Sequence, residues 1–186
     1  MAKIIITGTP GSGKTTILKS LSEFKIINMG TEMMKYAAEK VANRDSIRKQ
    51  LSYSEINEIR HRIFEGFNST TYDFLLETHT SVKAGSKYIP GFSEDELRML
   101  KEVKAIIYID ATAGEILLRR QSDSSREREN ETEEDINEQR SINIALASYF
   151  SACLNVPLYM VRNRQNRVSE ASNEIRNAIN EAFSRR

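Results

Sequence analysis

The chain has very little of the residues that mark several classes of protein. Its 186 residues include one cysteine, three prolines and no tryptophan. Because Cys153 is alone, the chain cannot form a disulfide framework or a four-cysteine zinc site by itself. Apolar runs long enough to cross a bilayer, about 20 residues, are also missing. We therefore expect neither a disulfide-stapled domain nor a membrane-spanning protein.

An excess of charge of either sign is missing as well. Lys and Arg number 27 and Asp and Glu number 26, so the net charge is +1 although charged residues make up 28% of the chain. Proteins that bind nucleic acid or membrane surfaces generally carry a strong positive excess, so we predict neither partner. The chain opens directly on a strand-like segment without the charged and apolar regions of a signal peptide, and we therefore expect a cytoplasmic protein.

The most specific feature that is present is a glycine-rich segment near the start. Residues 8–15 read Gly-Thr-Pro-Gly-Ser-Gly-Lys-Thr and fit the pattern G-x-x-x-x-G-K-[ST]. An apolar run, residues 3–7, precedes this phosphate loop, and a helical stretch, residues 14–21, continues from it. Glycines allow successive backbone N–H groups to face phosphate oxygens, and the helix start adds a positive dipole. The sequence therefore predicts a nucleoside triphosphate site.

Each residue of the phosphate loop has an expected contact with the nucleotide. Lys14 is expected to reach the β- and γ-phosphates, and the Thr15 hydroxyl to ligate Mg²⁺. The predicted ATP-binding residues are Gly8, Thr9, Pro10, Gly11, Ser12, Gly13, Lys14, Thr15 and Thr16. The alternative, a glycine-rich turn without a ligand, is disfavoured by the correct context on both sides.

Strand-like and helical segments alternate along most of the chain. Besides residues 3–7, four short apolar runs predict strands at residues 25–28, 72–76, 105–109 and 158–161. They are continuously apolar, which favours parallel strands covered on both faces. Three pairs predict capped helix starts: Ser52 with Glu55, Ser93 with Glu96, and Thr132 with Asp135. With a final helix over residues 169–183, the pattern predicts an α/β protein with a three-layer α/β/α fold and about five parallel strands.

Two regions do not fit this alternation. Residues 31–68, which we call the helical lobe, read as two or three helices, far more than one connection between strands needs. Residues 121–134, which we call the cover, are polar, lack Gly and Pro and include Arg126 and Arg128. We therefore expect a single P-loop domain over residues 1–186 with these two insertions.

The phosphate loop alone does not separate kinases from other proteins that carry it. A GTPase would normally contain N-K-x-D and D-x-x-G, and neither is present. A helicase or a transporter engine usually needs a longer chain. The helical lobe and the arginine-rich cover favour a kinase of a small acceptor, because a closed cover excludes water and directs the phosphoryl group to the acceptor.

Motifs spread over nearly the whole chain point to one family of such kinases. They are residues 3–16, 27–31 (Ile-Asn-Met-Gly-Thr), 44–49 (Arg-Asp-Ser-Ile-Arg-Lys), 77–80 (Glu-Thr-His-Thr), 88–91 (Tyr-Ile-Pro-Gly), Arg120-Gln121 with Arg126 and Arg128, and Arg140 shortly before Ile142. In these motifs the chain resembles the archaeal-type adenylate kinases. The resemblance implies the P-loop kinase fold, an AMP-binding lobe, an arginine-rich lid, Mg²⁺ as cofactor, and the reaction ATP + AMP ⇌ 2 ADP.

The resemblance also implies an AMP site. Gly30 and Thr31 would begin the AMP lobe, Arg48 would grip the AMP phosphate, and Thr78 and His79 would face the acceptor. A general-base role for His79 is disfavoured, because the AMP phosphate is already ionised and needs no base. His61 is expected on the surface or in the packing of the lobe.

The predicted catalytic and metal residues complete the site. By the same resemblance, the catalytic residues would be Lys14, Arg120, Arg126, Arg128 and Arg140. The arginines would surround the transferred phosphoryl group, since guanidinium groups bind phosphate through two parallel N–H donors. Mg²⁺ would be held by Thr15 directly and by Glu77 through water; the family usually has Asp in place of Glu77.

Two other functions stay open at this point. The acceptor could be CMP, UMP or an alcohol, and the chain could instead be an adenylate-kinase-like ATPase that acts as an assembly or binding switch. The resemblance further implies a homotrimer, for which the sequence offers only apolar residues at 142–150 that could equally belong to the core.

Overall fold

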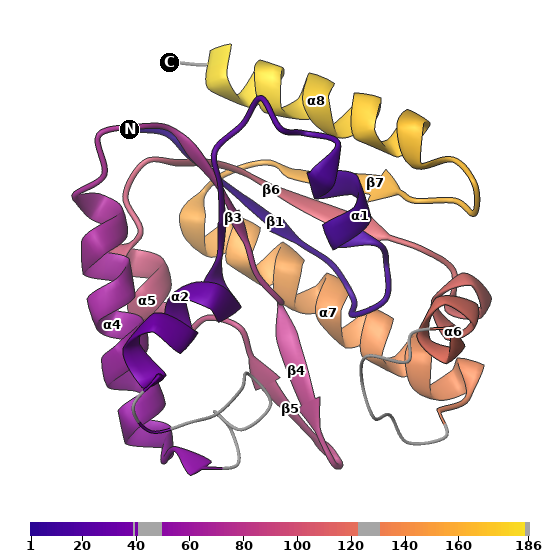
Figure 1. Ribbon diagram of the computed structural model, residues 1–186, viewed down its shortest axis with the longest axis horizontal. Helices are drawn as coiled ribbons and strands as arrows, with labels where there is room; N and C mark the ends of the chain where they lie inside the picture. Colours follow the sequence, from indigo (N-terminus) through magenta and orange to yellow (C-terminus); the bar gives the residue numbers. More distant parts are fainter. Residues whose placement is uncertain (39, 41–49, 123–130, 185–186) are drawn as a thin grey trace.

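A five-stranded parallel sheet forms the centre of the molecule (Figure 1). The computed structural model describes residues 1–38, 40, 50–122 and 131–184. The strands follow the order β2-β3-β1-β6-β7 and comprise β1 (Lys3–Thr7), β2 (Ile26–Asn28), β3 (Phe74–Glu77), β6 (Val103–Asp110) and β7 (Leu158–Arg162). From β1 the chain builds β2 and β3 in one half of the sheet and then crosses to β6 and β7 in the other half, so the strand order reverses at β1. Ligands in such sheets bind outside the carboxyl ends of the strands at this position.

Helices cover both faces of the sheet (Figure 1). On one face, α1 (Lys14–Lys19) and α8 (Val168–Ser184) pack against a cluster that includes Ile4 and Ile6. On the other, α4 (Tyr53–Asn68), α5 (Glu94–Met99) and α7 (Glu133–Leu154) pack against a cluster that includes Ile5. Successive residues of a strand point to opposite faces, so a strand covered on both sides must be apolar throughout. The predicted three-layer α/β/α fold is thereby confirmed.

Local sequence signals identify the element boundaries closely. Each predicted strand lies within two residues of an observed one. All three predicted capping boxes are present, at the starts of α4, α5 and α7. A fourth, which sequence reasoning did not single out, joins Thr112 and Glu115 at the start of α6 (Ala113–Gln121). These caps satisfy backbone N–H groups that have no partner within the helix.

A small antiparallel hairpin was not predicted. It consists of β4 (Ser81–Ala84) and β5 (Lys87–Pro90), joined by a turn in which Gly85 has a φ of 60°. Its strands contain lysines, and β5 is mostly exposed, so the continuous apolarity that identified the other strands is missing. The hairpin follows β3 directly and therefore starts at the carboxyl edge of the main sheet.

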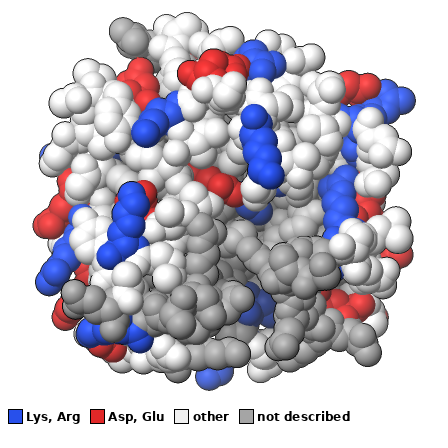
Figure 2. Space-filling model, in the orientation of Figure 1, with Lys and Arg blue, Asp and Glu red and all other residues white. Residues whose placement is uncertain are grey.

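The helical lobe contributes α2 (Met29–Ala37) and α4 between β2 and β3. The two helices pack through a cluster around Ala37 and Leu51. Arg48 of the lobe and Arg126 and Arg128 of the cover lie outside the described residues. The described helices include no segment with the length and apolarity that a membrane crossing requires. On the face shown in Figure 2, acidic and basic side chains are interspersed.

Candidate active site

The phosphate loop leaves the carboxyl end of β1 and leads into α1. Gly11 and Gly13 have φ values of 88° and 92°, in the left-handed region that residues with a side chain rarely adopt. Gly8 is required for a second reason, which is lack of space for a side chain: an added Cβ would clash with the Ile109 carbonyl of β6. An added Cβ at Gly13 would clash with the Asn163 amide. The glycines of the motif are thus required both by backbone conformation and by close packing at the strand ends.

Lys14 folds back over the beginning of the phosphate loop. Its Nζ donates hydrogen bonds to the carbonyl of Gly8 at 2.6 Å and to that of Thr9 at 3.3 Å. The residue is 6% exposed, so its positive charge lies close to the loop backbone. A buried ammonium group beside a turn of backbone N–H groups favours an anion at this position.

Glu77, the last residue of β3, connects the phosphate loop to the helical lobe. One carboxylate oxygen lies 3.5 Å from the Thr15 hydroxyl, and the other accepts from the Asn28 amide at 2.6 Å. Asn28 ends β2 and is the N-cap of α2, where its oxygen accepts from the backbone N–H of Thr31 at 3.0 Å. The two residues predicted to hold magnesium, Thr15 and Glu77, are therefore brought together.

Arg120 braces the phosphate loop. Its guanidinium donates to the Pro10 carbonyl through Nε at 3.1 Å and Nη2 at 2.7 Å. It also donates to Glu131 at 2.6 Å and to Gln139 at 2.7 Å, and its side chain is 5% exposed. These contacts place the arginine beside the loop. Its predicted contact with a transferred phosphoryl group stays a prediction.

Arg140 of α7 lies at the next strand end. It donates to both oxygens of Asp110, the last residue of β6, at 3.0 and 2.8 Å. Hydrogen bonding to this carboxylate raises the pKa of Arg140 above its ordinary value. A third bond goes from Arg140 to the Asn137 side chain at 2.8 Å. The positive charge is thereby fixed at the carboxyl edge of the sheet.

Two residues at the site were not among the predicted ones. Arg119 donates to the Ser12 carbonyl at 3.1 Å and to the Asn163 carbonyl at 3.0 Å. Asn163, which directly follows β7, donates from its amide to the same Ser12 carbonyl at 2.8 Å. Its position after a parallel strand was the available signal, since the carboxyl ends of all these strands meet at one edge.

The predicted AMP residues that the structure describes lie in two places. Gly30 and Thr31 are in the first turn of α2, next to the Asn28–Glu77 contact. Thr78 and His79 follow Glu77, and the Thr78 N–H donates to Ile6 of β1 at 3.0 Å. Both groups lie at strand ends close to the phosphate loop. Arg48, the fifth predicted AMP residue, is outside the described residues.

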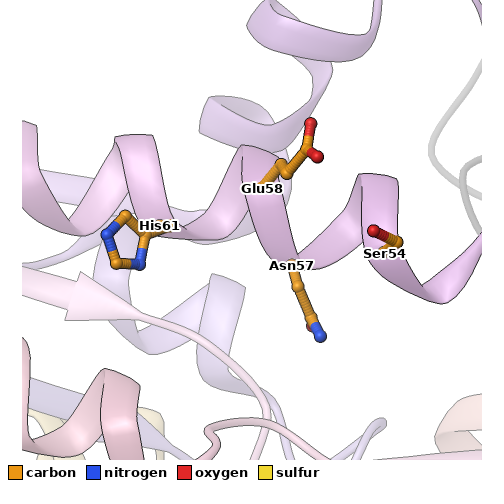
Figure 3. A pocket seen from close by; sticks show the side chains of 4 residues that line it. All are labelled: Ser54, Asn57, Glu58 and His61. Atoms are coloured by element: carbon orange, nitrogen blue, oxygen red, sulfur yellow. The ribbon is translucent and has the colours of Figure 1, made fainter.

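His61 lies apart from these residues. It lines a surface hollow together with Ser54, Asn57 and Glu58, all of which project from α4 (Figure 3). The imidazole is well exposed and lies 3.6 Å from Glu65 of the same helix. Of the two positions expected for His61, the surface or the packing of the lobe, the structure shows the surface position.

A phosphate loop after the central strand, with a carboxylate and arginines at the neighbouring strand ends, defines the chain as a P-loop protein of the kinase type. A family model described as an AAA domain matches residues 7–137. A shikimate kinase from Acinetobacter baumannii, solved with shikimate, superposes with a TM-score of 0.65 at 15% identity and covers 97% of this chain and 94% of that one. A shikimate kinase from Bacteroides thetaiotaomicron gives 0.63 at 10% identity, covering 96% and 98%. These likenesses show the fold.

Sequence relatives narrow the class further. An adenylate kinase from Thermoplasma acidophilum is 34% identical over 92% of this chain and 94% of its own length. One from Thermococcus kodakarensis is 31% identical, with 97% and 96% covered, and one from Pyrobaculum aerophilum is 36% identical, with 72% and 71% covered. The chain belongs to the adenylate kinase family and is a nucleoside monophosphate phosphotransferase. The archaeal resemblance stated from its motifs is confirmed.

Proposed function

We propose that the protein transfers the γ-phosphoryl group of ATP to AMP and forms two molecules of ADP. The observation that best supports this assignment is the position of Glu77. It contacts Thr15 of the phosphate loop on one side and, through Asn28, the start of α2 with Gly30 and Thr31 on the other. In this proposal the donor site and the acceptor site would share one carboxylate at the strand ends.

ATP would bind along the phosphate loop. The backbone N–H groups of residues 8–15 and the start of α1 would hold its phosphates, and Lys14 would exchange its two carbonyl contacts for phosphate oxygens. An ammonium group that already lies over the loop needs only a small displacement to do so. The nine predicted ATP-binding residues retain this role in the proposal.

The residues around Thr15 fit Mg²⁺. This ion prefers oxygen ligands, keeps several waters and is commonly held by one or two protein groups together with substrate phosphates. A hydroxyl and a carboxylate 3.5 Å apart provide such groups, and the described residues contain no cluster of three or more metal-ligating side chains that would hold an ion without substrate. Thr15 would bind Mg²⁺ directly and Glu77 through water. When bound, the ion neutralises charge on the β- and γ-phosphates.

AMP would bind on the other side of Glu77. Gly30, Thr31, Thr78 and His79 would surround it, and Arg48 would hold its phosphate. Because that phosphate is an ionised nucleophile, the site needs to orient it and exclude water rather than remove a proton. His79 is therefore proposed to position AMP.

The arginines would stabilise the charge of the transferred group. Arg120 donates to Pro10, Glu131 and Gln139 and would have to release Glu131 to reach a phosphate, whereas Arg140, with five N–H donors and bonds to Asp110 and Asn137, could contact Asp110 and a phosphate together. We propose that they act with Arg126 and Arg128 when the cover, residues 121–134, closes. The helical lobe, residues 31–68, would close from the other side within the one domain, residues 1–186.

A panel of acceptors tests this function. The chain is incubated with Mg·ATP and AMP, CMP, UMP or no acceptor, and the nucleotides are separated by chromatography. We expect ADP only with AMP, two molecules per turnover. Product with CMP or UMP would reassign the acceptor, whereas ADP and free phosphate without any acceptor would favour the ATPase switch.

A homotrimer is part of the same proposal, and it rests on the resemblance alone. Light scattering at micromolar concentration tests it: a mass three times the 21.3 kDa of the chain is expected, and a monomer would contradict it.

A further inference from the structure

A buried asparagine on α7 joins the two sides of the active site. Asn143 is fully buried. Its amide nitrogen donates to the Thr9 hydroxyl of the phosphate loop at 3.3 Å. Its amide oxygen accepts from the hydroxyls of Thr80 at 2.8 Å and Ser81 at 2.7 Å. We call residues 78–81 the acceptor segment, because they follow Glu77 and include the predicted AMP residues Thr78 and His79.

Both ends of this connection are firmly held. The Thr9 hydroxyl shares a second hydrogen bond, 2.8 Å long, with the hydroxyl of Tyr108 in β6, and the Thr9 carbonyl accepts from Lys14. At the other end, the Thr80 carbonyl accepts from the Gly91 N–H at 2.6 Å, at the end of the β4–β5 hairpin. A shift of Asn143 would therefore move the phosphate loop relative to the acceptor segment.

The network is costly unless it is complete. A buried amide or hydroxyl that has no hydrogen-bond partner costs about 1–3 kcal/mol of folding free energy. Each polar group of this network is therefore held in the position that its partners determine. Burial also raises the pKa of Tyr108 to about 12, so the phenol stays neutral and keeps its hydrogen bond to Thr9. Gln139 lies one turn before Asn143 on the same face of α7. It accepts a hydrogen bond from Arg120, which itself contacts the phosphate loop.

We propose that Asn143 is a positioning residue of the phosphoryl transfer: it sets the distance between the phosphate loop and the acceptor segment so that the two phosphates meet in line. This inference rests on the proposed function. Misplacement by about 1 Å costs on the order of a hundredfold in rate. Because Asn143 is fully buried and bonds to Thr9, Thr80 and Ser81, we expect it to contact neither nucleotide, so binding of each nucleotide by itself should change little.

The test compares two Asn→Leu variants of the full-length chain. Asn143→Leu replaces the amide with an apolar group that has the same number of heavy atoms but a larger volume, and it removes every side-chain hydrogen bond of Asn143. Asn68→Leu is the matched control. Asn68 also bridges two segments, since it donates to the Met99 carbonyl at 2.6 Å and accepts from the Lys101 N–H at 3.1 Å. These contacts lie at the amino ends of β3 and β6, whereas the active site lies at the carboxyl ends of the strands. The kcat, the KM for ATP and for AMP, and the thermal unfolding midpoint are measured for both.

We expect Asn143→Leu to lower kcat by about ten- to a hundredfold, with both KM values within about threefold of wild type. Asn68→Leu should lower the unfolding midpoint and leave kcat within about twofold. An unchanged kcat in Asn143→Leu, or equal losses of kcat in the two variants, would overturn the inference. A wild-type chain that makes no ADP from ATP and AMP would instead overturn the proposed function, and the inference with it.

A second pair of variants serves if Asn143→Leu does not fold. Thr80→Val removes one of the two hydroxyls from which Asn143 accepts, and Thr80→Ser keeps it. The valine variant should lose kcat and the serine variant should recover it. If both retain the wild-type kcat, or if valine lowers only the unfolding midpoint, the connection has no part in positioning.

Discussion

The phosphate loop and the acceptor side of the site are built in different ways. The loop is one continuous segment whose glycines, lysine and threonine lie within eight residues, and in our proposal its contacts with phosphate would come mainly from the backbone. The acceptor side combines the end of β2, the end of β3, the β4–β5 hairpin and α7. A site made from one segment keeps its geometry locally, whereas a site made from four depends on side chains that join them. Glu77 and Asn143 are these joining side chains.

The largest effect is expected on the loop side. Lys14→Met removes the lysine that folds back over the phosphate loop, and we expect kcat to fall by about a thousandfold because charge on the transferred group is no longer neutralised. Steady-state kinetics measure the loss. Lys19→Met, an exposed lysine of the same helix, is the control and should keep wild-type kcat. Near-normal turnover of Lys14→Met would contradict the assignment of the phosphate loop to the active site.

The next prediction compares the stability lost when a buried arginine, Arg120, and an exposed one, Arg98, are replaced by alanine. Arg120→Ala leaves Glu131 and the Pro10 carbonyl without their donor in a buried site, and we expect a loss of about 3–5 kcal/mol in unfolding free energy. Arg98→Ala breaks an exposed pair with Glu94 on α5 and should cost less than about 1 kcal/mol. Denaturant unfolding measures both. Equal losses would show that Arg120 does not brace the loop.

The polar network predicts a dependence of stability on pH. Burial raises the pKa of Tyr108 from 10.0 to about 12, so the folded state retains a proton that the unfolded state has released. The contribution of Tyr108 to stability is therefore complete below pH 10 and is lost as the pH rises from 10 to 12, by about 2–3 kcal/mol. Unfolding of wild type and Tyr108→Phe is compared across this range. Parallel curves would show that the phenol titrates normally.

The smallest effect is expected where the two sides share a carboxylate. Glu77→Asp shortens the side chain by one methylene, so one carboxylate can no longer lie 3.5 Å from Thr15 and 2.6 Å from Asn28 at the same time. We expect the Mg²⁺ concentration for half-maximal activity to rise by about tenfold. Glu58→Asp, at an exposed position of α4, is the control. No change in the Mg²⁺ requirement of Glu77→Asp would contradict the proposed role of Glu77.

The difference between the two sides also explains what could be predicted from the sequence. The strands that carry continuous apolar runs, the capping boxes and the phosphate loop are local patterns; they identify the fold and the place of the proposed ATP site. Glu77 was found because it ends a predicted strand and because its motif resembles a known family. Each of these signals needs only a few neighbouring residues.

The contacts that were missed have no local pattern. Asn143 and Thr9 are 134 residues apart in sequence, and Arg119 and Asn163 are 44 apart. Asn143 interrupts the apolar face of a helix, which shows that a polar side chain is buried but not what it contacts. The β4–β5 hairpin has polar, exposed strands and gives no periodic signal. Tertiary contacts of this kind can be identified only when the order of the strands in the sheet is known.

Transfer of label tests the central claim most directly. ATP labelled at its γ-phosphate is mixed with unlabelled AMP, Mg²⁺ and the chain. The products are separated while only part of the ATP has been consumed. If the loop and the acceptor side hold ATP and AMP together, the label appears at the β-phosphate of ADP and none as free phosphate. Label found as free phosphate, at the same rate with and without AMP, would contradict the account.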